Sequence, residues 1–118
     1  MSGLPTIAKN IREVQGRGSH VGRPGGSHPL HRASDAQQVI NNRNQVCPKH
    51  KKRPPGYQCD EYPFASAWEG GKKLPPIDRI ADWVPKKENQ RRGMLLSLFY
   101  RVNRIMRGSP GDAFYVRA

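Results

Sequence analysis

Apolar residues recur at helical spacing in the last third of the chain, and this is the clearest pattern in the sequence. They follow one another at i, i+1, i+4, i+5, i+8, i+11 and i+12: Met94, Leu95, Leu98, Phe99, Val102, Ile105 and Met106. This spacing predicts a helix from about Glu88 to Met106 with one apolar stripe, which we expect the core to need. Arginines fill the other faces, and Gly108 is typical of a helix end.

The remaining predicted elements are shorter and include both a helix and strands. Ser34 favours the start of a short helix over residues 35–40. Residues 82–84 and 113–116 predict short strands, the second of them after a turn at Gly111-Asp112. We therefore expect an α+β fold with a long C-terminal helix and a closing strand.

The first third of the chain shows little apolar periodicity. Only Ile7, Ile11 and Val14 suggest a short helical face, and residues 16–29 are rich in glycine, as is typical of a loop or linker. We expect residues 1–33 to form a Gly-rich lead-in or linker, and residues 34–118 to form the domain.

The charge balance points to an anionic partner. The 118 residues include 21 Lys and Arg but 9 Asp and Glu, for a net charge of +12. Nucleic acid is the first candidate and an acidic membrane the second, while solubility alone is the bland alternative. We expect no membrane binding, because the apolar stripe of the long helix is needed by the core. No run approaches the roughly 18 apolar residues of a membrane span, and the first residues do not resemble a signal peptide.

The acidic residues of this basic chain are candidates for chemistry. Asp60, Glu61, Glu69 and Glu88 lie in its second half. Arginines could neutralise them, as in ordinary surface ion pairs, or a divalent cation could, since carboxylate oxygens suit such ions. A basic surface around an acidic metal site is what a metal-dependent nuclease requires.

One string of residues narrows these possibilities. Residues 59–71 read Cys-Asp-Glu-Tyr-Pro-Phe-Ala-Ser-Ala-Trp-Glu-Gly-Gly, and residues 84–93 read Val-Pro-Lys-Lys-Glu-Asn-Gln-Arg-Arg-Gly. Together with the ending at residues 111–116, these segments resemble the NucA/NucB-type deoxyribonucleases. The resemblance covers residues 34–118 and implies a ββα-metal nuclease core, in which a base lies on a strand and a metal ligand on the following helix.

The resemblance also implies roles for particular residues. Asp60 matches the position of the base, and Asn89 matches a metal ligand at the start of the helix. Glu61, Glu69 and Glu88 are further candidates for binding Mg²⁺ or Mn²⁺ or for orienting its waters. An arginine of the helix, Arg91 or Arg92, is expected to hold the charge on the phosphate. Asp60 is thus expected as both base and metal ligand, and Glu61, Glu88 and Arg92 as further catalytic residues.

Further basic residues are expected to bind the DNA backbone. They lie in the turn-rich segment after Cys47 and on the long helix: Lys49, Lys51, Lys52, Arg53, Arg91 and Arg101. Phosphate contacts do not distinguish DNA from RNA, so RNA stays open as a substrate.

The two cysteines, Cys47 and Cys59, have three interpretations. They form a disulfide, as suits an exported protein, or they bind zinc with His50 and a distant ligand such as His31, or they are free thiols. The spacing fits no standard zinc motif well, so we favour the disulfide.

Together these patterns predict a metal-dependent endonuclease with little sequence preference, acting mainly on DNA. We expect it to be secreted, or to be the C-terminal toxin module of a larger exported protein that an acidic immunity protein inhibits. A basic DNA-binding module without chemistry is the alternative.

Overall fold

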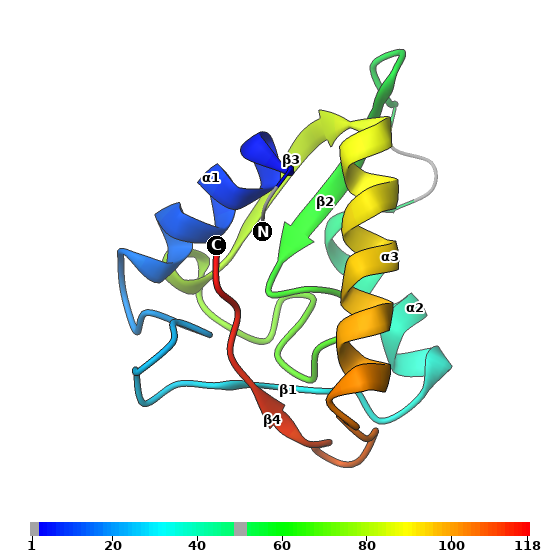
Figure 1. The fold of residues 1–118 in the computed structure, drawn as a ribbon. Helices are drawn as coiled ribbons and strands as arrows, with labels where there is room; N and C mark the ends of the chain where they lie inside the picture. Colours follow the sequence, from blue (N-terminus) through cyan, green and yellow to red (C-terminus); the bar gives the residue numbers. More distant parts are fainter. Residues whose placement is uncertain (1–2, 49–51) are drawn as a thin grey trace.

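The computed structural model describes residues 3–48 and 52–118. Figure 1 shows the helices and strands in chain order, and their bounds are α1 (Pro5–Gln15), β1 (Leu30–His31), α2 (Ala36–Val46), β2 (Tyr57–Tyr62), η1 (Pro76–Asp78, a 3₁₀ turn), β3 (Ile80–Pro85), α3 (Lys86–Val102) and β4 (Ala113–Phe114). The predicted α+β class, the long helix near the C-terminus and the closing strand are confirmed.

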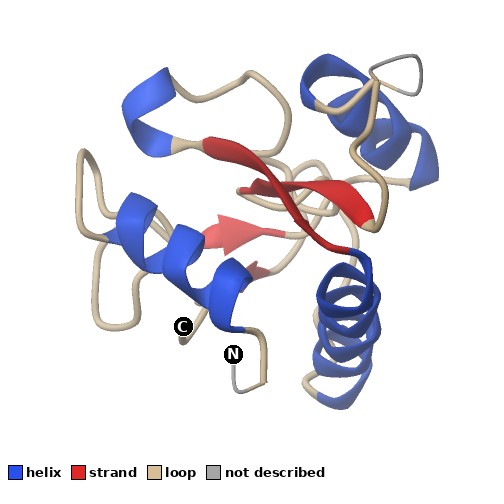
Figure 2. Cartoon of the chain, turned by 90° about the horizontal axis from the view of Figure 1, so that it is seen from above, coloured by secondary structure: helices blue, strands red, loops and turns tan. Residues whose placement is uncertain are grey.

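A two-stranded antiparallel ribbon and the helix after it form the centre of the fold. β2 pairs with β3 along its whole length, and Asp60 lies opposite Asp82 in the register. α3 follows β3 without a loop, so β2, β3 and α3 form a ββα unit. Figure 2 shows α1 and α3 on one side of the ribbon and α2 on the other. β1 and β4 form a second, smaller antiparallel pair.

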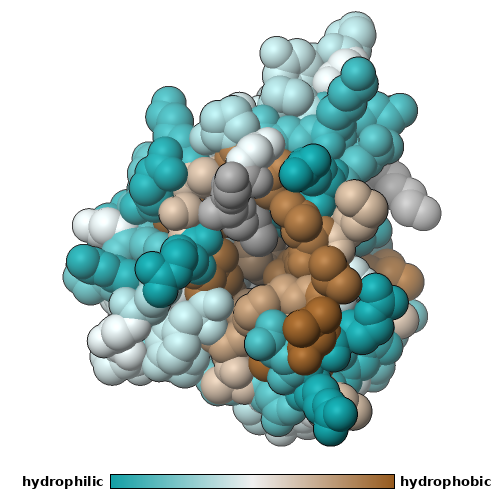
Figure 3. Space-filling view, viewed as in Figure 1, coloured by the Kyte–Doolittle hydropathy of each residue, from teal (hydrophilic) through white to brown (hydrophobic). Residues whose placement is uncertain are grey.

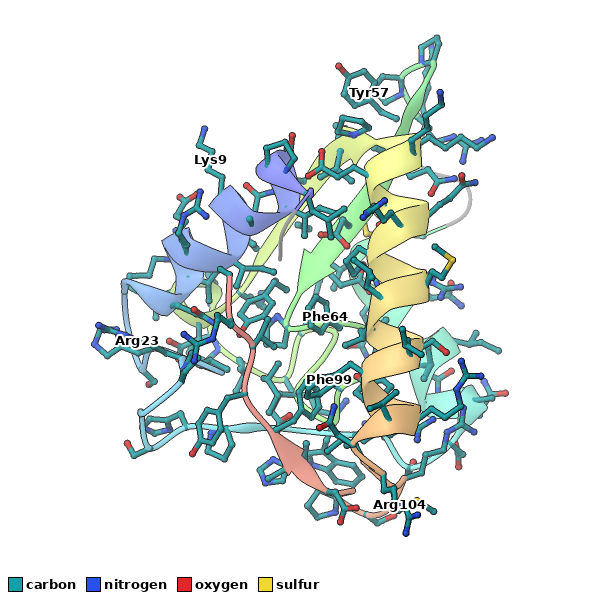
Figure 4. All side chains as sticks on the ribbon, in the orientation of Figure 1. Lys9, Arg23, Tyr57, Phe64, Phe99 and Arg104 are labelled. Atoms are coloured by element: carbon teal, nitrogen blue, oxygen red, sulfur yellow. A yellow bond between two sulfur atoms is a disulfide. The ribbon has the colours of Figure 1, made fainter. Side chains whose placement is uncertain are left out.

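The core lies between α1, α3 and the ribbon. Tyr62 and Phe64 are its largest fully buried side chains, and their rings meet edge to face with centroids 5.3 Å apart. Phe64 and Phe99 point into the interior in Figure 4, whereas Lys9, Arg23 and Arg104 point outward. Apolar residues at the start of α1 and along it complete this cluster: Leu4, which directly precedes the helix, and Ile7, Ile11 and Val14.

The structure departs from the linker expected over residues 1–33. Pro5 begins α1, where a missing N–H costs nothing, and Ile7, Ile11 and Val14 are buried against the rest of the protein. The Gln15 amide also donates a hydrogen bond of 2.8 Å to the Val116 carbonyl, at the other end of the chain. The helical face suggested by three residues is therefore a packed helix, and tertiary contacts compensate for the weak local pattern.

α3 is shorter than predicted, and its apolar stripe is only partly buried. The helix ends at Val102, because Arg104 takes a left-handed conformation with φ of 52° and turns the chain. Met94, Leu98 and Val102 are exposed at 66%, 45% and 68%. The expectation that the core needs the whole stripe is wrong, and so is the argument against membrane binding that rested on it.

The buried side of α3 is its other apolar edge. Leu96 and Tyr100 are buried, and Leu95 and Phe99 pack beside them. Figure 3 shows apolar side chains gathered on this face of the molecule, next to α3 and the C-terminal segment. The predicted stripe therefore contributes Leu95 and Phe99 to the core, whereas the two buried residues of the helix, Leu96 and Tyr100, lie outside that stripe.

Two smaller elements also differ from the prediction. The helix expected over residues 35–40 extends to Val46, and Asp35 rather than Ser34 caps it by accepting a hydrogen bond of 2.9 Å from the Gln38 amide. The closing strand comprises two residues, Ala113 and Phe114. Among the described residues, no helix is long and apolar enough to cross a membrane.

Candidate active site

A cleft of about 770 Å³ opens beside β2, between α2 and the first turns of α3. About half of its lining side chains are polar or basic, and Glu61 is the acidic one among the lining residues that the structure describes. The lining residues used below are Arg43, Cys47, Arg53, Gln58, Cys59, Glu61, Ser66, Asn89 and Arg92. Three arginines and one carboxylate around a cavity make a site that suits an anionic ligand.

Glu61 is a buried carboxyl group at the wall of this cleft. Its residue is 8% exposed, and its Oε1 atom has no hydrogen-bond partner among the described residues. Burial, helped by the neighbouring charge of Asp60, raises the pKa of Glu61 from 4.5 to about 7, although Arg92 and Arg43 lower it. A carboxyl group of this kind takes up a proton or a cation near neutral pH.

Asp60 is still more deeply buried and faces an arginine. Its Oδ1 atom lies 3.1 Å from Nη2 of Arg92, and the residue is 3% exposed. Burial raises the pKa of Asp60, while the charge of Arg92 lowers it and the charges of Glu88 and Asp82 raise it further. Asp60 is not among the residues that line the cleft, so Arg92 links this carboxylate to it.

Arg92 also joins Asp60 to the start of α3. Its Nη2 atom donates a hydrogen bond of 3.1 Å to Oδ1 of Asn89, and the Asn89 amide donates one of 2.8 Å to Oε1 of Gln58. The guanidinium lies over the Phe64 ring, 5.4 Å from its centre. Asn89 and Arg92 are three residues apart, so one helix face presents both to the cleft.

Two of the predicted acidic residues lie elsewhere. Both carboxylate oxygens of Glu69 face His31, at 2.8 Å from its backbone nitrogen and 2.6 Å from Nδ1. Glu88 Oε1 accepts a hydrogen bond of 2.7 Å from the Ile7 amide in the first turn of α1. Neither residue lines the cleft, and both carboxylates have structural partners.

The predicted DNA-binding residues are also dispersed. Arg53 lines the cleft, and Lys52, its neighbour in the sequence, is exposed. Arg91 and Arg101 are exposed on α3, away from the residues that line the cleft. Lys49 and Lys51 lie outside the described residues.

The predicted disulfide is confirmed. Cys47 at the end of α2 is bonded to Cys59 in β2, with their Cα atoms 5.8 Å apart. This bond attaches α2 to the strand that carries Asp60 and Glu61. The zinc alternative is not realised in this oxidised state, in which His31 is paired with Glu69; His50 lies outside the described residues.

The glycine pair of the string at residues 59–71 has a structural reason. A side chain on Gly70 would put its Cβ 2.5 Å from the Phe64 carbonyl oxygen and 2.8 Å from the Asn42 amide nitrogen. Asn42 is buried on α2 and donates hydrogen bonds of 2.9 and 3.0 Å to the carbonyls of Ala65 and Ala67. The string therefore folds closely against α2, which forms the other wall of the cleft.

Sequence reasoning missed Arg43 and Gln58. Arg43 lies on α2, for which the sequence carried no functional pattern, and only the fold brings it to the cleft. Gln58 directly precedes the string at residues 59–71. Its place in the site follows from the fold, which brings Asn89 of α3 within 2.8 Å of Gln58 Oε1.

The ββα unit with a basic, carboxylate-containing cleft defines a class of small α+β proteins suited to polyanionic ligands. The sequence comparison agrees with this class: residues 18–117 match the family Deoxyribonuclease NucA/NucB. The chain therefore belongs to this nuclease family. The match begins inside the expected linker, in keeping with the burial of Val21, Leu30 and Ala33. A separate search of curated proteins found no match to the chain.

Proposed function

We propose that the protein is a metal-dependent endonuclease that hydrolyses DNA in the cleft beside β2. The observation that carries this proposal is Glu61, a buried carboxyl with an unpartnered oxygen that faces a cleft lined by three arginines. Membership of a deoxyribonuclease family makes DNA the first substrate to consider. The three arginines, Arg43, Arg53 and Arg92, would hold the phosphates of the backbone.

The oxygen atoms of the cleft fit a hard divalent cation such as Mg²⁺ or Mn²⁺. Glu61 offers a carboxylate at the wall of the cleft. The amide oxygens of Asn89 and Gln58 accept hydrogen bonds from Arg92 and Asn89 and would exchange these for the ion. Such ions are bound by one or two carboxylates together with amide oxygens and waters. When bound there, the ion would stabilise negative charge on the scissile phosphate. Glu61 with an unpartnered oxygen fits this role better than Glu69 or Glu88, whose oxygens have partners.

Asp60 and Arg92 would act together on the substrate. Arg92 lines the cleft and is shared between Asp60 and Asn89. An incoming phosphate competes for the same guanidinium, because both groups are anions that suit its planar donors. When the Arg92 guanidinium turns to the phosphate, Asp60 no longer has beside it the charge that lowers its pKa. We propose that the movement of Arg92 opens Asp60 to the cleft, where its carboxylate takes a proton from the attacking water.

A cleavage assay with three variants and a matched control tests this proposal. Supercoiled plasmid and a structured RNA are incubated side by side with Mg²⁺ or Mn²⁺, with and without chelator. Asp60→Asn, Glu61→Gln and Asn89→Ala are expected to lower cleavage by at least about 100-fold. Glu13→Gln is the control, since the Glu13 side chain is 50% exposed in an ion pair with Arg17, and it is expected to keep activity within a few-fold.

Two results would contradict the proposal. Plasmid that stays intact at micromolar protein with every divalent metal would exclude cleavage, and a gel shift of that uncut plasmid would favour a DNA-binding module. Full activity of Glu61→Gln in folded protein would exclude the proposed metal ligand.

We also propose that the enzyme acts outside the cytoplasm, either secreted or delivered into a target cell. The Cys47–Cys59 disulfide supports this, because disulfides persist mainly in oxidising compartments. The net charge of +12 would favour fast capture by an acidic immunity protein in the toxin case. The chain is expressed in a bacterial strain whose cytoplasm forms disulfides, with and without a small acidic protein encoded beside it. Growth arrest, and its rescue by the acidic protein, test the toxin hypothesis.

A further inference from the structure

The disulfide and Glu61 lie together at the wall of the cleft. Cys47 Sγ, Cys59 Sγ and a Glu61 carboxylate oxygen all lie within 4.8 Å of one another. Glu61 Oε2 is 3.1 Å from Cys47 Sγ, a sulfur without a proton to donate while the disulfide is intact. We propose that reduction of this disulfide creates a binding site for one Zn²⁺ ion, with the two thiolates and the Glu61 carboxylate as its protein ligands.

The change of state is a balanced two-electron step. A dithiol reductant gives two electrons and two protons to the Cys47–Cys59 bond, which breaks into two thiols while the reductant becomes a disulfide. Zn²⁺ then replaces the two thiol protons, which are released to solvent. A water from the open cleft takes the fourth position, as in zinc sites with three protein ligands.

The distances allow this rearrangement without a change of fold. Zn–S bonds of about 2.3 Å in a tetrahedral site put the two sulfurs about 3.8 Å apart. The Cα atoms of Cys47 and Cys59 are 5.8 Å apart, so rotation of the two side chains provides this separation. The Glu61 carboxylate is already beside both sulfurs.

The charges around the site favour the loaded state. Two thiolates and one carboxylate with Zn²⁺ carry a net charge of −1. Arg43, Arg53 and Arg92 line the same cleft and balance this charge. Glu61 Oε2, which already lies 3.1 Å from Cys47 Sγ, is the carboxylate oxygen placed to bind the ion.

The site would select a different metal from the one proposed for catalysis. Thiolates prefer Zn²⁺, whereas Mg²⁺ and Mn²⁺ prefer oxygen ligands. One consequence rests on the proposed function. Zinc would occupy Glu61, the proposed ligand of the catalytic metal, and would block the nuclease wherever the protein is reduced. A cell that makes the enzyme in a reducing, zinc-containing cytoplasm would then be protected until export oxidises the cysteines.

Cobalt binding tests the site without any nuclease assay. The protein is reduced with a phosphine under anaerobic conditions, freed of reductant and titrated with Co²⁺. We expect sulfur-to-cobalt charge-transfer absorption that saturates at one equivalent and disappears when Zn²⁺ is added. The oxidised protein in the same buffer is expected to show none.

Variants separate the folded site from a pair of free thiols. Cys47→Ser is expected to abolish the absorption, and Glu61→Gln to weaken zinc affinity by more than about tenfold. Asp82→Asn, an exposed carboxylate on the partner strand, is the matched control and is expected to leave affinity unchanged. Circular dichroism of each reduced protein reports whether the fold is kept.

Either of two results overturns the zinc site. The first is the absence of charge-transfer absorption in the reduced protein. The second is equal zinc affinity in wild type and Glu61→Gln, which would show that the two thiols bind zinc without the Glu61 carboxylate. Cleavage by the oxidised enzyme with Mn²⁺ is measured separately. Active oxidised enzyme without a cobalt signal overturns the zinc site alone, and a cobalt signal with inactive oxidised enzyme overturns the proposed nuclease alone.

Discussion

Glu61→Gln is expected to make the metal-free protein more stable at neutral pH. Burial raises the pKa of Glu61 from 4.5 to about 7, so the folded chain holds this proton more tightly than the unfolded chain. At about 1.4 kcal/mol per pKa unit, the difference corresponds to about 3 kcal/mol of unfolding free energy. The glutamine keeps the shape of the side chain and removes its ionisation.

The sign of the pH dependence follows from the raised pKa. The contribution of protonated Glu61 to stability is fully present below pH 4.5 and is lost as the pH rises through about 7. Glu61→Gln has no carboxyl group to ionise at this position, so it does not lose this stability as the pH rises. Wild type and Glu61→Gln are therefore expected to have similar stability near pH 4.5 and to differ by about 3 kcal/mol near pH 8, a difference in melting temperature on the order of 10 °C.

Urea unfolding in chelator, followed by circular dichroism at several pH values, measures this difference. Glu13→Gln is the matched control, since the Glu13 side chain is 50% exposed in an ion pair with Arg17, and it is expected to change stability by less than about 0.5 kcal/mol. Added Mn²⁺ is expected to stabilise wild type but not Glu61→Gln. Parallel pH profiles for wild type and Glu61→Gln would refute the reasoning from burial.

Four other substitutions test the packing around the site. Glu88→Ala removes the acceptor of the Ile7 amide, which lies 2.7 Å away, and is expected to cost about 1–2 kcal/mol in urea unfolding; no loss would exclude the capping role. Leu96→Ala is expected to cost about 2–5 kcal/mol, because Leu96 is buried. Met94→Ala, on the exposed edge of the same helix, is expected to cost less than about 0.5 kcal/mol, and equal losses at the two positions would contradict the burial of α3. Asn42→Ala leaves two carbonyls of the loop after β2 without their donor and is expected to cost about 2–3 kcal/mol, whereas a near-neutral melting temperature would show that water replaces the amide.

Several features of this protein could be predicted from local sequence. The string at residues 59–71 identified the family, which the comparison over residues 18–117 confirms. The disulfide was the favoured reading of two cysteines and is present. The apolar spacing of residues 94–102 predicted α3, because a helical period is a local property of the chain.

Tertiary structure alone decided which groups meet. Which edge of α3 is buried depends on α1 and β4, so Leu96 lies in the core while Met94 lies in solvent. The acidic residues looked alike in the sequence, yet Glu88 caps α1 and Glu61 faces the cleft. Arg92 lies 3.1 Å from Asp60 only because α3 packs against the ribbon. Burial and long-range pairing set the ionisation of these groups, and neither can be read from the spacing of residues along the chain.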